Sequence, residues 1–156
     1  MRKKPARLSA LLGGACLLAG CASGPQTQAL VPAGFDRVTV GGELRQRIER
    51  NFDRLETDYY QPDQVYWTEE QSGGWPGDKE GRTILALVLD AQASGRTPLY
   101  LDELIRRLPR ELNAKGYLGS IHEGSADEQQ LSGHGWLLRG LCEYYAWKKD
   151  PQVLEI

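Results

Sequence analysis

The sequence predicts an all-α fold. Apolar residues recur at helical spacing in several long segments, whereas the strict alternation of apolar and polar residues that marks a strand is scarce. Glycine and proline separate these segments, as they do at the ends of helices. Two of the segments also align with each other, which predicts a repeated helical hairpin.

The N-terminus has the form of a secretory signal. A basic head precedes the run LSALLGGACLLAG, which is shorter than the roughly 20 apolar residues needed to span a bilayer. The run ends in Leu18-Ala19-Gly20-Cys21, which resembles the lipobox of bacterial lipoproteins, where the cysteine carries the lipid. We expect a signal peptide over residues 1–20 and lipidation at Cys21. The alternative is a secreted protein with a chance cysteine at this position.

The predicted lipid would anchor the protein to a membrane of the bacterial cell envelope without a spanning segment. Ala22 after the cysteine favours the outer membrane, by the same resemblance. Residues 21–42, rich in Gly, Pro, Gln and Ala, are expected to form a flexible tether, and residues 43–156 form the predicted domain.

Composition excludes some classes of partner. Removing residues 1–20, which hold four basic and no acidic side chains, leaves 136 residues and changes the formal net charge from −2 to −6. An acidic chain without a basic stripe is not expected to bind nucleic acid. Only Cys142 would remain in the predicted domain, so neither a disulfide framework nor a Cys/His zinc spacing is predicted.

The first half of the predicted domain contains two helices separated by a loop. The segment GELRQRIERNFDRLETDYY predicts an amphipathic helix, because its apolar residues fall on one stripe. These residues are Leu44, Ile48, Phe52 and Leu55. Residues 61–81, rich in Gly, Pro and Trp, predict a long loop. The segment EGRTILALVLDAQASG follows, and its small polar face predicts a helix buried on most sides.

The second half repeats this alternation. Thr97 and Pro98 predict the next helix start as N-cap and first residue, and Pro109 predicts a kink or an early end. Residues 113–116 then supply a stop. A second loop, YLGSIHEGSADEQQ, leads into SGHGWLLRGLCEYYAWKKD, which predicts another mostly apolar helix. We expect Cys142 to be an inert buried thiol in this helix.

The two apolar helices align with an offset of 53 residues, the distance between Pro98 and Pro151. At this offset Ile84 matches Leu137 and Val88 matches Leu141. A period of this size is one helical hairpin, the unit of helical solenoids and toroids. Because such hairpins need neighbours to cover their apolar faces, we expect the chain to be the truncated start of a larger array.

Two segments carry a resemblance to a known family. GRTILALVLDAQASGR with LDELIRRLPRELNAKGYLGSI, and LSGHGWLLRGLCEYYAWKKDPQVLE after them, resemble the first helix pairs of β-L-arabinofuranosidase-like glycoside hydrolases. The likeness covers about residues 40–156. It implies part of an (α/α)6 toroid, the six-hairpin glycosidase fold, and a carbohydrate substrate cleaved with retention through a covalent intermediate.

The same resemblance implies that this chain lacks the catalytic residues. In the family, the cysteine nucleophile, the acid/base glutamate and the zinc ligands lie downstream of the matched region. Zinc is therefore implied for the full-length family, while no cofactor and no metal site are expected in this chain. Cys142 does not match the nucleophile, and the family's early histidine falls closer to Trp136 than to His134.

The stretch SGGWPGDKEGR, residues 72–82, is one candidate binding site, because it would lie at the entrance of a toroid pocket. Trp75 could stack on a sugar ring, and Asp78 and Glu80 could accept hydrogen bonds from its hydroxyl groups. Under the alternative, Asp78 caps the following helix and Glu80 stabilises its N-terminal dipole.

His134 is the second candidate, because it lies between Gly133 and Gly135 at the equivalent entrance. The glycines permit close approach of either a ligand or another helix, so His134 is either a ligand contact or a packed structural residue. Four residues of the preceding loop have metal-binding side chains, but their spacing matches no known metal site. These are His122, Glu123, Asp127 and Glu128.

Two functions fit these observations. The first is an N-terminal fragment of a glycoside hydrolase that acts on glycans, for example β-L-arabinofuranosides, and is inactive alone. The second is a non-catalytic helical envelope lipoprotein that binds a glycan or a partner protein. In the second case, the apolar face that missing hairpins would otherwise cover is the expected docking surface for a partner.

Overall fold

A computed structural model of the chain describes residues 30–66 and 74–156. The chain divides into two compact units, Met1–Pro32 and Ala33–Ile156, and the second contains all the elements described below. The predicted signal peptide, the predicted lipidation site Cys21 and the first part of the predicted tether lie outside the described residues, as does part of the predicted loop 61–81.

The structure confirms the predicted all-α class, since no strand occurs in residues 30–66 or 74–156. The elements are η1 (Phe35–Arg37), α1 (Gly42–Leu55), η2 (Asp58–Tyr60), α2 (Pro62–Val65), α4 (Asp78–Ser94), α5 (Leu101–Glu111), α6 (Glu128–Lys148) and α7 (Gln152–Glu155). In this part of the chain, none of the helices has the length and apolar character needed to cross a membrane.

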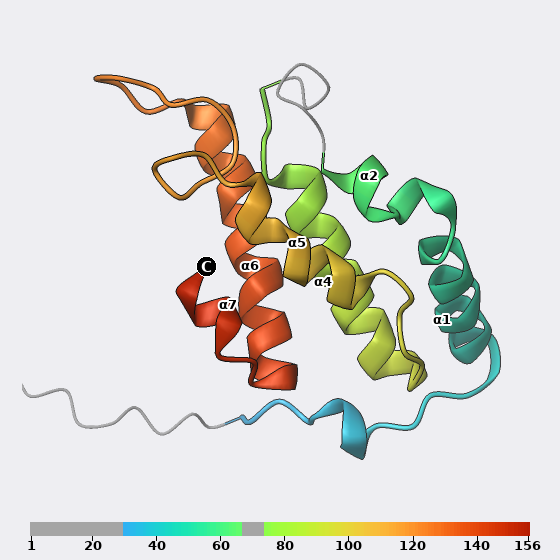
Figure 1. The fold of residues 1–156 in the computed structure, drawn as a ribbon. Helices are drawn as coiled ribbons and strands as arrows, with labels where there is room; N and C mark the ends of the chain where they lie inside the picture. The colour runs from blue at the N-terminus through green and yellow to red at the C-terminus, as the bar shows by residue number, and fades with distance from the viewer. Residues whose placement is uncertain (1–29, 67–73) are drawn as a thin grey trace, which may run out of the picture. The chain divides into compact units, whose positions relative to one another are not determined.

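Helices α4 and α6 lie side by side and run in the same direction (Figure 1). Glycines allow their backbones to approach closely. A Cβ added at Gly81 of α4 would lie 2.2 Å from the backbone nitrogen of Leu137, and one at Gly140 of α6 would lie 2.7 Å from the carbonyl oxygen of Gly81. Since real Cβ atoms do not approach other atoms so closely, the pairing of α4 with α6 depends on glycine at these positions.

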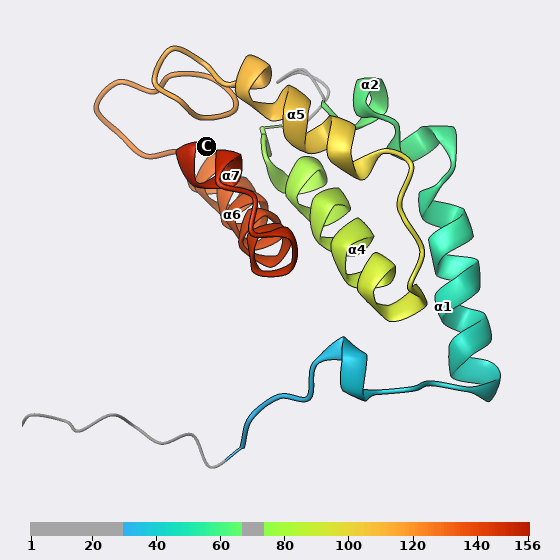
Figure 2. The ribbon, with the colours of Figure 1, turned by 60° about the horizontal axis from the view of Figure 1, so that its bottom comes forward.

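Helix α1 packs against the other side of α4 and runs in the opposite direction (Figure 2). The Asn51 side chain donates to the buried Asp90 carboxylate over 2.8 Å, and the Arg45 guanidinium donates to the Ser94 carbonyl over 3.1 Å. Only the second half of the predicted apolar stripe is buried, because Leu44 stays exposed while Phe52 and Leu55 enter the core.

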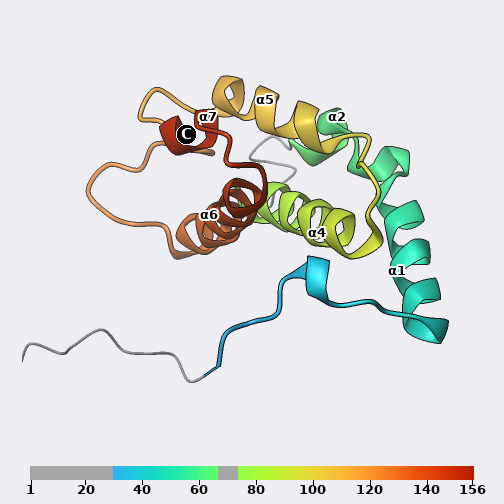
Figure 3. The same ribbon diagram turned by 90° about the horizontal axis from the view of Figure 1, so that it is seen from below.

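Helices α5 and α7 lie on one side of the α4–α6 pair (Figure 3). Helix α5 buries one apolar stripe, which consists of Leu101, Leu104, Ile105 and Leu108. Twice along the chain, a long helix is followed by a shorter one, in the order that the predicted repeat requires. Helix α4 ends at Ser94 and α6 at Lys148, while α5 begins at Leu101 and α7 at Gln152.

The predicted start of α5 is wrong by several residues. The helix begins at Leu101 rather than at Pro98, and Thr97 does not cap it. The segment before α5 is held instead by α1, because the Glu56 carboxylate accepts from the Leu99 N–H at 3.0 and 3.1 Å. Pro109 lies inside the last turn of α5, which continues through the proline and ends at Glu111, so the helix does not end at Pro109.

The predicted burial of Cys142 is also wrong, because its side chain is exposed. The buried residues of α6, Gly133, Leu137, Leu141 and Tyr144 among them, form one stripe. Each residue turns by about 100° around a helix, so Cys142 follows Leu141 onto the solvent side. Leu131 and Leu138 are 66 % and 62 % exposed on α6, and the predicted partner for such an apolar face stays a prediction.

Candidate ligand pocket at the start of helix α4

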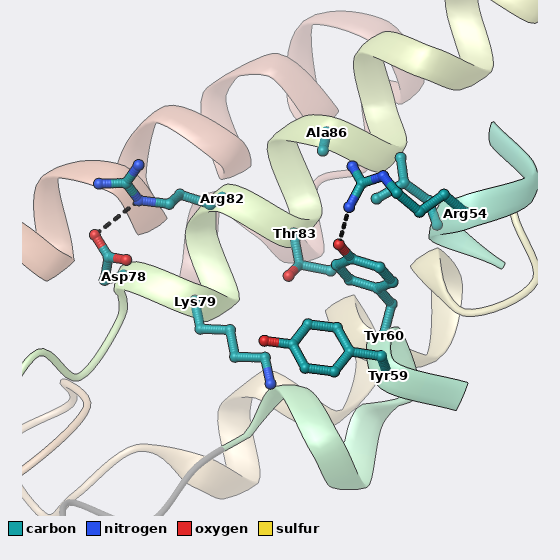
Figure 4. A pocket seen from close by; sticks show the side chains of 9 residues that line it. Arg54, Tyr59, Tyr60, Asp78, Lys79, Arg82, Thr83 and Ala86 are labelled. Carbon is teal, nitrogen blue, oxygen red and sulfur yellow. Dashed lines mark hydrogen bonds and ion pairs between the residues drawn. The ribbon is translucent and has the colours of Figure 1, made fainter. Parts of the chain in front are cut away.

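A pocket of about 380 Å³ lies between the end of α1, η2 and the first turns of α4 (Figure 4). We call it the η2–α4 pocket. Its lining residues are Arg54, Leu55, Tyr59, Tyr60, Asp78, Lys79, Arg82, Thr83 and Ala86. Two phenol rings and four charged side chains thus face the same space.

The end of α1 positions the two tyrosines. Leu55 anchors the last turn of α1 in the core, and the chain then turns through Glu56 and Thr57 into η2. Within η2, Tyr60 packs against the core while Tyr59 is 56 % exposed. Their rings meet edge to face with centroids 4.9 Å apart, so the inner ring supports the outer one.

Arg54 and Lys79 bring positive charge to these rings. The Arg54 guanidinium donates to the Tyr60 hydroxyl and, over 3.1 Å, to the Asn51 amide oxygen. The Lys79 ammonium donates to the Gln64 carbonyl over 2.6 Å and lies 4.2 Å from the centroid of the Tyr59 ring. Partial burial lowers the pKa of Lys79, while the nearby Glu80 carboxylate acts in the opposite direction.

Asp78 and Arg82 form the other wall of the pocket. The Arg82 Nε donates to the Asp78 carboxylate over 2.8 Å, one helical turn apart on α4. The guanidinium also lies 4.2 Å from the centroid of the Trp136 ring on α6. Asp78 is therefore held by an ion pair at the pocket rim, where its position is fixed by the first turn of α4.

Glu80, the other predicted carboxylate, does not belong to the described lining of the η2–α4 pocket. It is 3 % exposed, and its carboxylate accepts from the Gly77 N–H over 2.9 Å. Gly77 has a φ of 92°, a left-handed conformation that glycine adopts without strain. The pair reproduces the glutamate half of a capping box, so Glu80 fixes the start of α4.

Trp75 precedes this cap and is 39 % exposed. It does not belong to the described lining of the η2–α4 pocket. Of the three candidates in residues 72–82, the structure brings only Asp78 to this pocket, and the sugar-binding roles assigned to Trp75 and Glu80 stay predictions.

His134 lies on α6, and both of its ring nitrogens bond to the backbone. Nδ1 is 2.6 Å from the Gln130 carbonyl oxygen, and the Leu118 N–H donates to Nε2 over 3.2 Å. This pattern requires the neutral ring with its proton on Nδ1. His134 thereby ties the loop before α6 to the helix, as the structural alternative expects.

A second pocket of about 230 Å³ lies beside this loop, at the start of α6. Tyr117, His122, Gln130 and His134 belong to its lining. The Gln130 amide donates to the Leu118 and Ser120 carbonyls over 3.0 and 3.1 Å, and its amide oxygen lies 3.0 Å from Nε2 of His122. The polar groups here are thus engaged in holding the loop.

Across residues 30–66 and 74–156, no group of three or more His, Cys, Asp or Glu side chains is arranged to hold a metal ion.

The sequence pattern did not single out Tyr59, Tyr60, Arg54 or Lys79. The adjacent tyrosines near the end of an amphipathic segment were the available signal, but their role depends on α4, which begins only at Asp78.

No family model, no curated protein and no solved structure matches this chain.

Proposed function

We propose that this chain is a non-catalytic helical lipoprotein of the bacterial envelope that binds a glycan in the η2–α4 pocket. The observation that carries the proposal is the pairing of an exposed, supported Tyr59 ring with several charged side chains in one pocket. The lipobox-like Leu18–Cys21 segment supports the envelope location.

This combination suits a sugar. A sugar ring has apolar C–H faces that stack on an aromatic side chain, and hydroxyl groups at its edge that donate and accept hydrogen bonds. Tyr59 offers ring surface, Asp78 offers carboxylate oxygens, and Arg54 offers N–H donors. A pocket of about 380 Å³ has the size of a small-molecule site.

Binding fits the geometry better than hydrolysis does. Glycoside hydrolysis ordinarily uses two carboxyl groups about 5–9.5 Å apart on either side of the scissile bond. Among the described lining residues of the η2–α4 pocket, Asp78 is the one carboxylate, and Arg82 already pairs with it. Glu80 is committed to the helix cap.

Binding of the full chain, in non-ionic detergent, to a panel of neutral and acidic oligosaccharides tests the proposal. Tyr59→Ala should weaken binding at least about fivefold, because it removes a stacking surface worth about 1 kcal/mol. Tyr117→Ala, in the second pocket, is the matched control and should leave the affinity unchanged. Binding that survives Tyr59→Ala, or no binding to any saccharide, would refute the proposal.

A second candidate is the glycoside-hydrolase-like toroid. The parallel α4–α6 pair with α5 and α7 on one side is the observation that favours it, because such layers of helices build (α/α) toroids. Its test is release of nitrophenol from 4-nitrophenyl β-L-arabinofuranoside by the full chain, with Asp78→Asn as the control. We expect no release from this chain. Release that Asp78→Asn abolishes would favour the hydrolase.

A further inference from the structure

The charges around the η2–α4 pocket are unevenly distributed. Its described lining holds three cationic side chains, Arg54, Lys79 and Arg82, and one carboxylate, Asp78. The buried Glu80 adds one negative charge behind the wall. The described lining itself thus holds more cationic than anionic side chains, in a chain whose formal net charge is −2.

Among these cations, Arg54 is the one best placed to contact a negatively charged group in the pocket. Its two hydrogen bonds go to the Tyr60 hydroxyl and the Asn51 amide oxygen, both neutral acceptors. A guanidinium has five N–H donors, so these bonds orient the group and leave its charge in place. That charge also acts on the Asp90 carboxylate, whose pKa it lowers. Arg54 does not take part in any of the ion pairs formed within residues 30–66 and 74–156. Arg82, in contrast, forms an ion pair with Asp78.

The position of Arg54 relative to the rings matters as well. Its guanidinium carbon lies 5.3 Å from the centroid of the Tyr60 ring, and Tyr60 contacts Tyr59. Lys79 adds a second positive charge 4.2 Å from the centroid of the Tyr59 ring. Figure 4 shows the Arg54 guanidinium beside the Tyr60 hydroxyl and the Lys79 side chain beside the Tyr59 ring. A ligand stacked on Tyr59 would therefore have a cation near each tyrosine.

We propose that the ligand of the η2–α4 pocket is an acidic saccharide, with its carboxylate bound by Arg54. This inference rests on the proposed glycan-binding function. A planar guanidinium matches a planar carboxylate and forms charge-assisted hydrogen bonds with it, which neutral sugars cannot provide.

The test compares saccharides that differ only in charge. The probes are trigalacturonate and trimannuronate, each with its fully methyl-esterified form, titrated into the full chain in non-ionic detergent by calorimetry. We expect the acids to bind about fivefold more tightly than the esters, which is the upper end of the effect of one exposed ion pair. Raising the salt concentration should reduce this preference, because salt screens exposed charges.

Two variants locate the effect. Arg54→Gln keeps a polar side chain and should abolish the preference for acid over ester. Arg106→Gln makes the same change of charge on the exposed surface of α5, outside the η2–α4 pocket, and should leave the preference intact.

The outcomes separate this inference from the proposed function. Equal affinities for acid and ester, weakened together by Tyr59→Ala, would overturn the acidic ligand while keeping glycan binding. A preference for acids that Arg54→Gln leaves unchanged would overturn the assignment of the carboxylate to Arg54, while keeping glycan binding. If no saccharide binds, the proposed function fails and the inference fails with it.

Discussion

Asp90 is a carboxylate buried between α4 and α1. Burial raises its pKa above the ordinary aspartate value of 3.8, and the hydrogen bond from Asn51 offsets part of this shift. Burying a carboxylate disfavours its charged form, so the native protein holds the Asp90 proton to a higher pH than the unfolded chain does. The native state then binds more protons than the unfolded state between these two pKa values.

Asp90 should therefore make the fold less stable as pH rises. The free energy of unfolding decreases wherever the native state binds more protons, so this loss begins near pH 4 and is complete above the raised native pKa. Asp90→Asn keeps an oxygen that can accept from Asn51 and removes the titration. Urea unfolding of both proteins at pH 4 and pH 8 measures the effect.

We expect the stability of Asp90→Asn relative to the native sequence to be greater at pH 8 than at pH 4. A difference between the two proteins that is constant with pH, or that changes in the opposite direction, would show that the native fold does not raise the Asp90 pKa.

At the same scale, the predicted site residues show what sequence can and cannot indicate. The residue types and their place near the start of α4 were readable from SGGWPGDKEGR. The direction of each side chain was not, because Glu80 turns back to the Gly77 N–H while Asp78 faces the pocket. His134 depends on the Leu118 backbone, sixteen residues earlier, which no local pattern reveals.

At the scale of elements, contact between α4 and α6 is the main feature of the fold. It requires glycine at Gly81, where an added Cβ would lie 2.2 Å from the Leu137 backbone nitrogen. Backbone atoms cannot move aside as a flexible side chain can, so a larger residue would have to separate the helices. Gly135, also on α6, has no atom within 4 Å of its added Cβ.

Gly81→Ala should lower the free energy of unfolding by about 3 kcal/mol, the upper range for overpacking a tight interface. Gly135→Ala is the matched control, and it should raise stability by up to about 1 kcal/mol because alanine favours the helix. Urea unfolding followed by circular dichroism provides both values. If Gly81→Ala proves as stable as Gly135→Ala, or more stable, the close packing of α4 on α6 would be contradicted.

The long elements were predictable and the short ones were not. The helices that became α1, α4, α5 and α6 carry apolar periodicity over several turns, which identifies a helix without tertiary information. The short elements η2 and α2 fall at the end of a predicted helix and within a predicted loop. They form because Tyr60, Val65 and Tyr66 pack on the core, and a sequence pattern does not show that contact.

The apolar periodicity of the sequence also did not predict how much of a helix surface is buried. The segment that became helix α6 was predicted to be mostly apolar, with Cys142 buried in it. Its contact with α4 covers one stripe, and Leu131, Leu138 and Cys142 remain exposed. Burial of the whole circumference needs several neighbours, and their number is a property of the assembled fold.

At the scale of the whole molecule, the domain is proposed to be held at a membrane through Cys21. Metabolic labelling with an alkyne fatty acid in a bacterial host should label the native chain and place it in the membrane fraction. Cys21→Ser should lose both the label and the membrane association, because the anchor is the lipid alone. Cys16→Ser is the matched control, since it lies in the predicted signal peptide and should keep both.

Retained label in Cys21→Ser would refute lipidation at this residue. Loss of label in Cys16→Ser as well would show instead that the signal, and not the acceptor cysteine, had been damaged.

The central claim is that the η2–α4 pocket holds the saccharide. A crystal structure of the chain soaked with trigalacturonate tests this most directly, because it shows the place and the orientation of the ligand together. We predict a sugar ring against Tyr59 with its carboxylate within hydrogen-bonding distance of the Arg54 guanidinium. A saccharide bound beside Tyr117 and His122, or an η2–α4 pocket that stays empty while the soaked crystal binds sugar elsewhere, would contradict the claim.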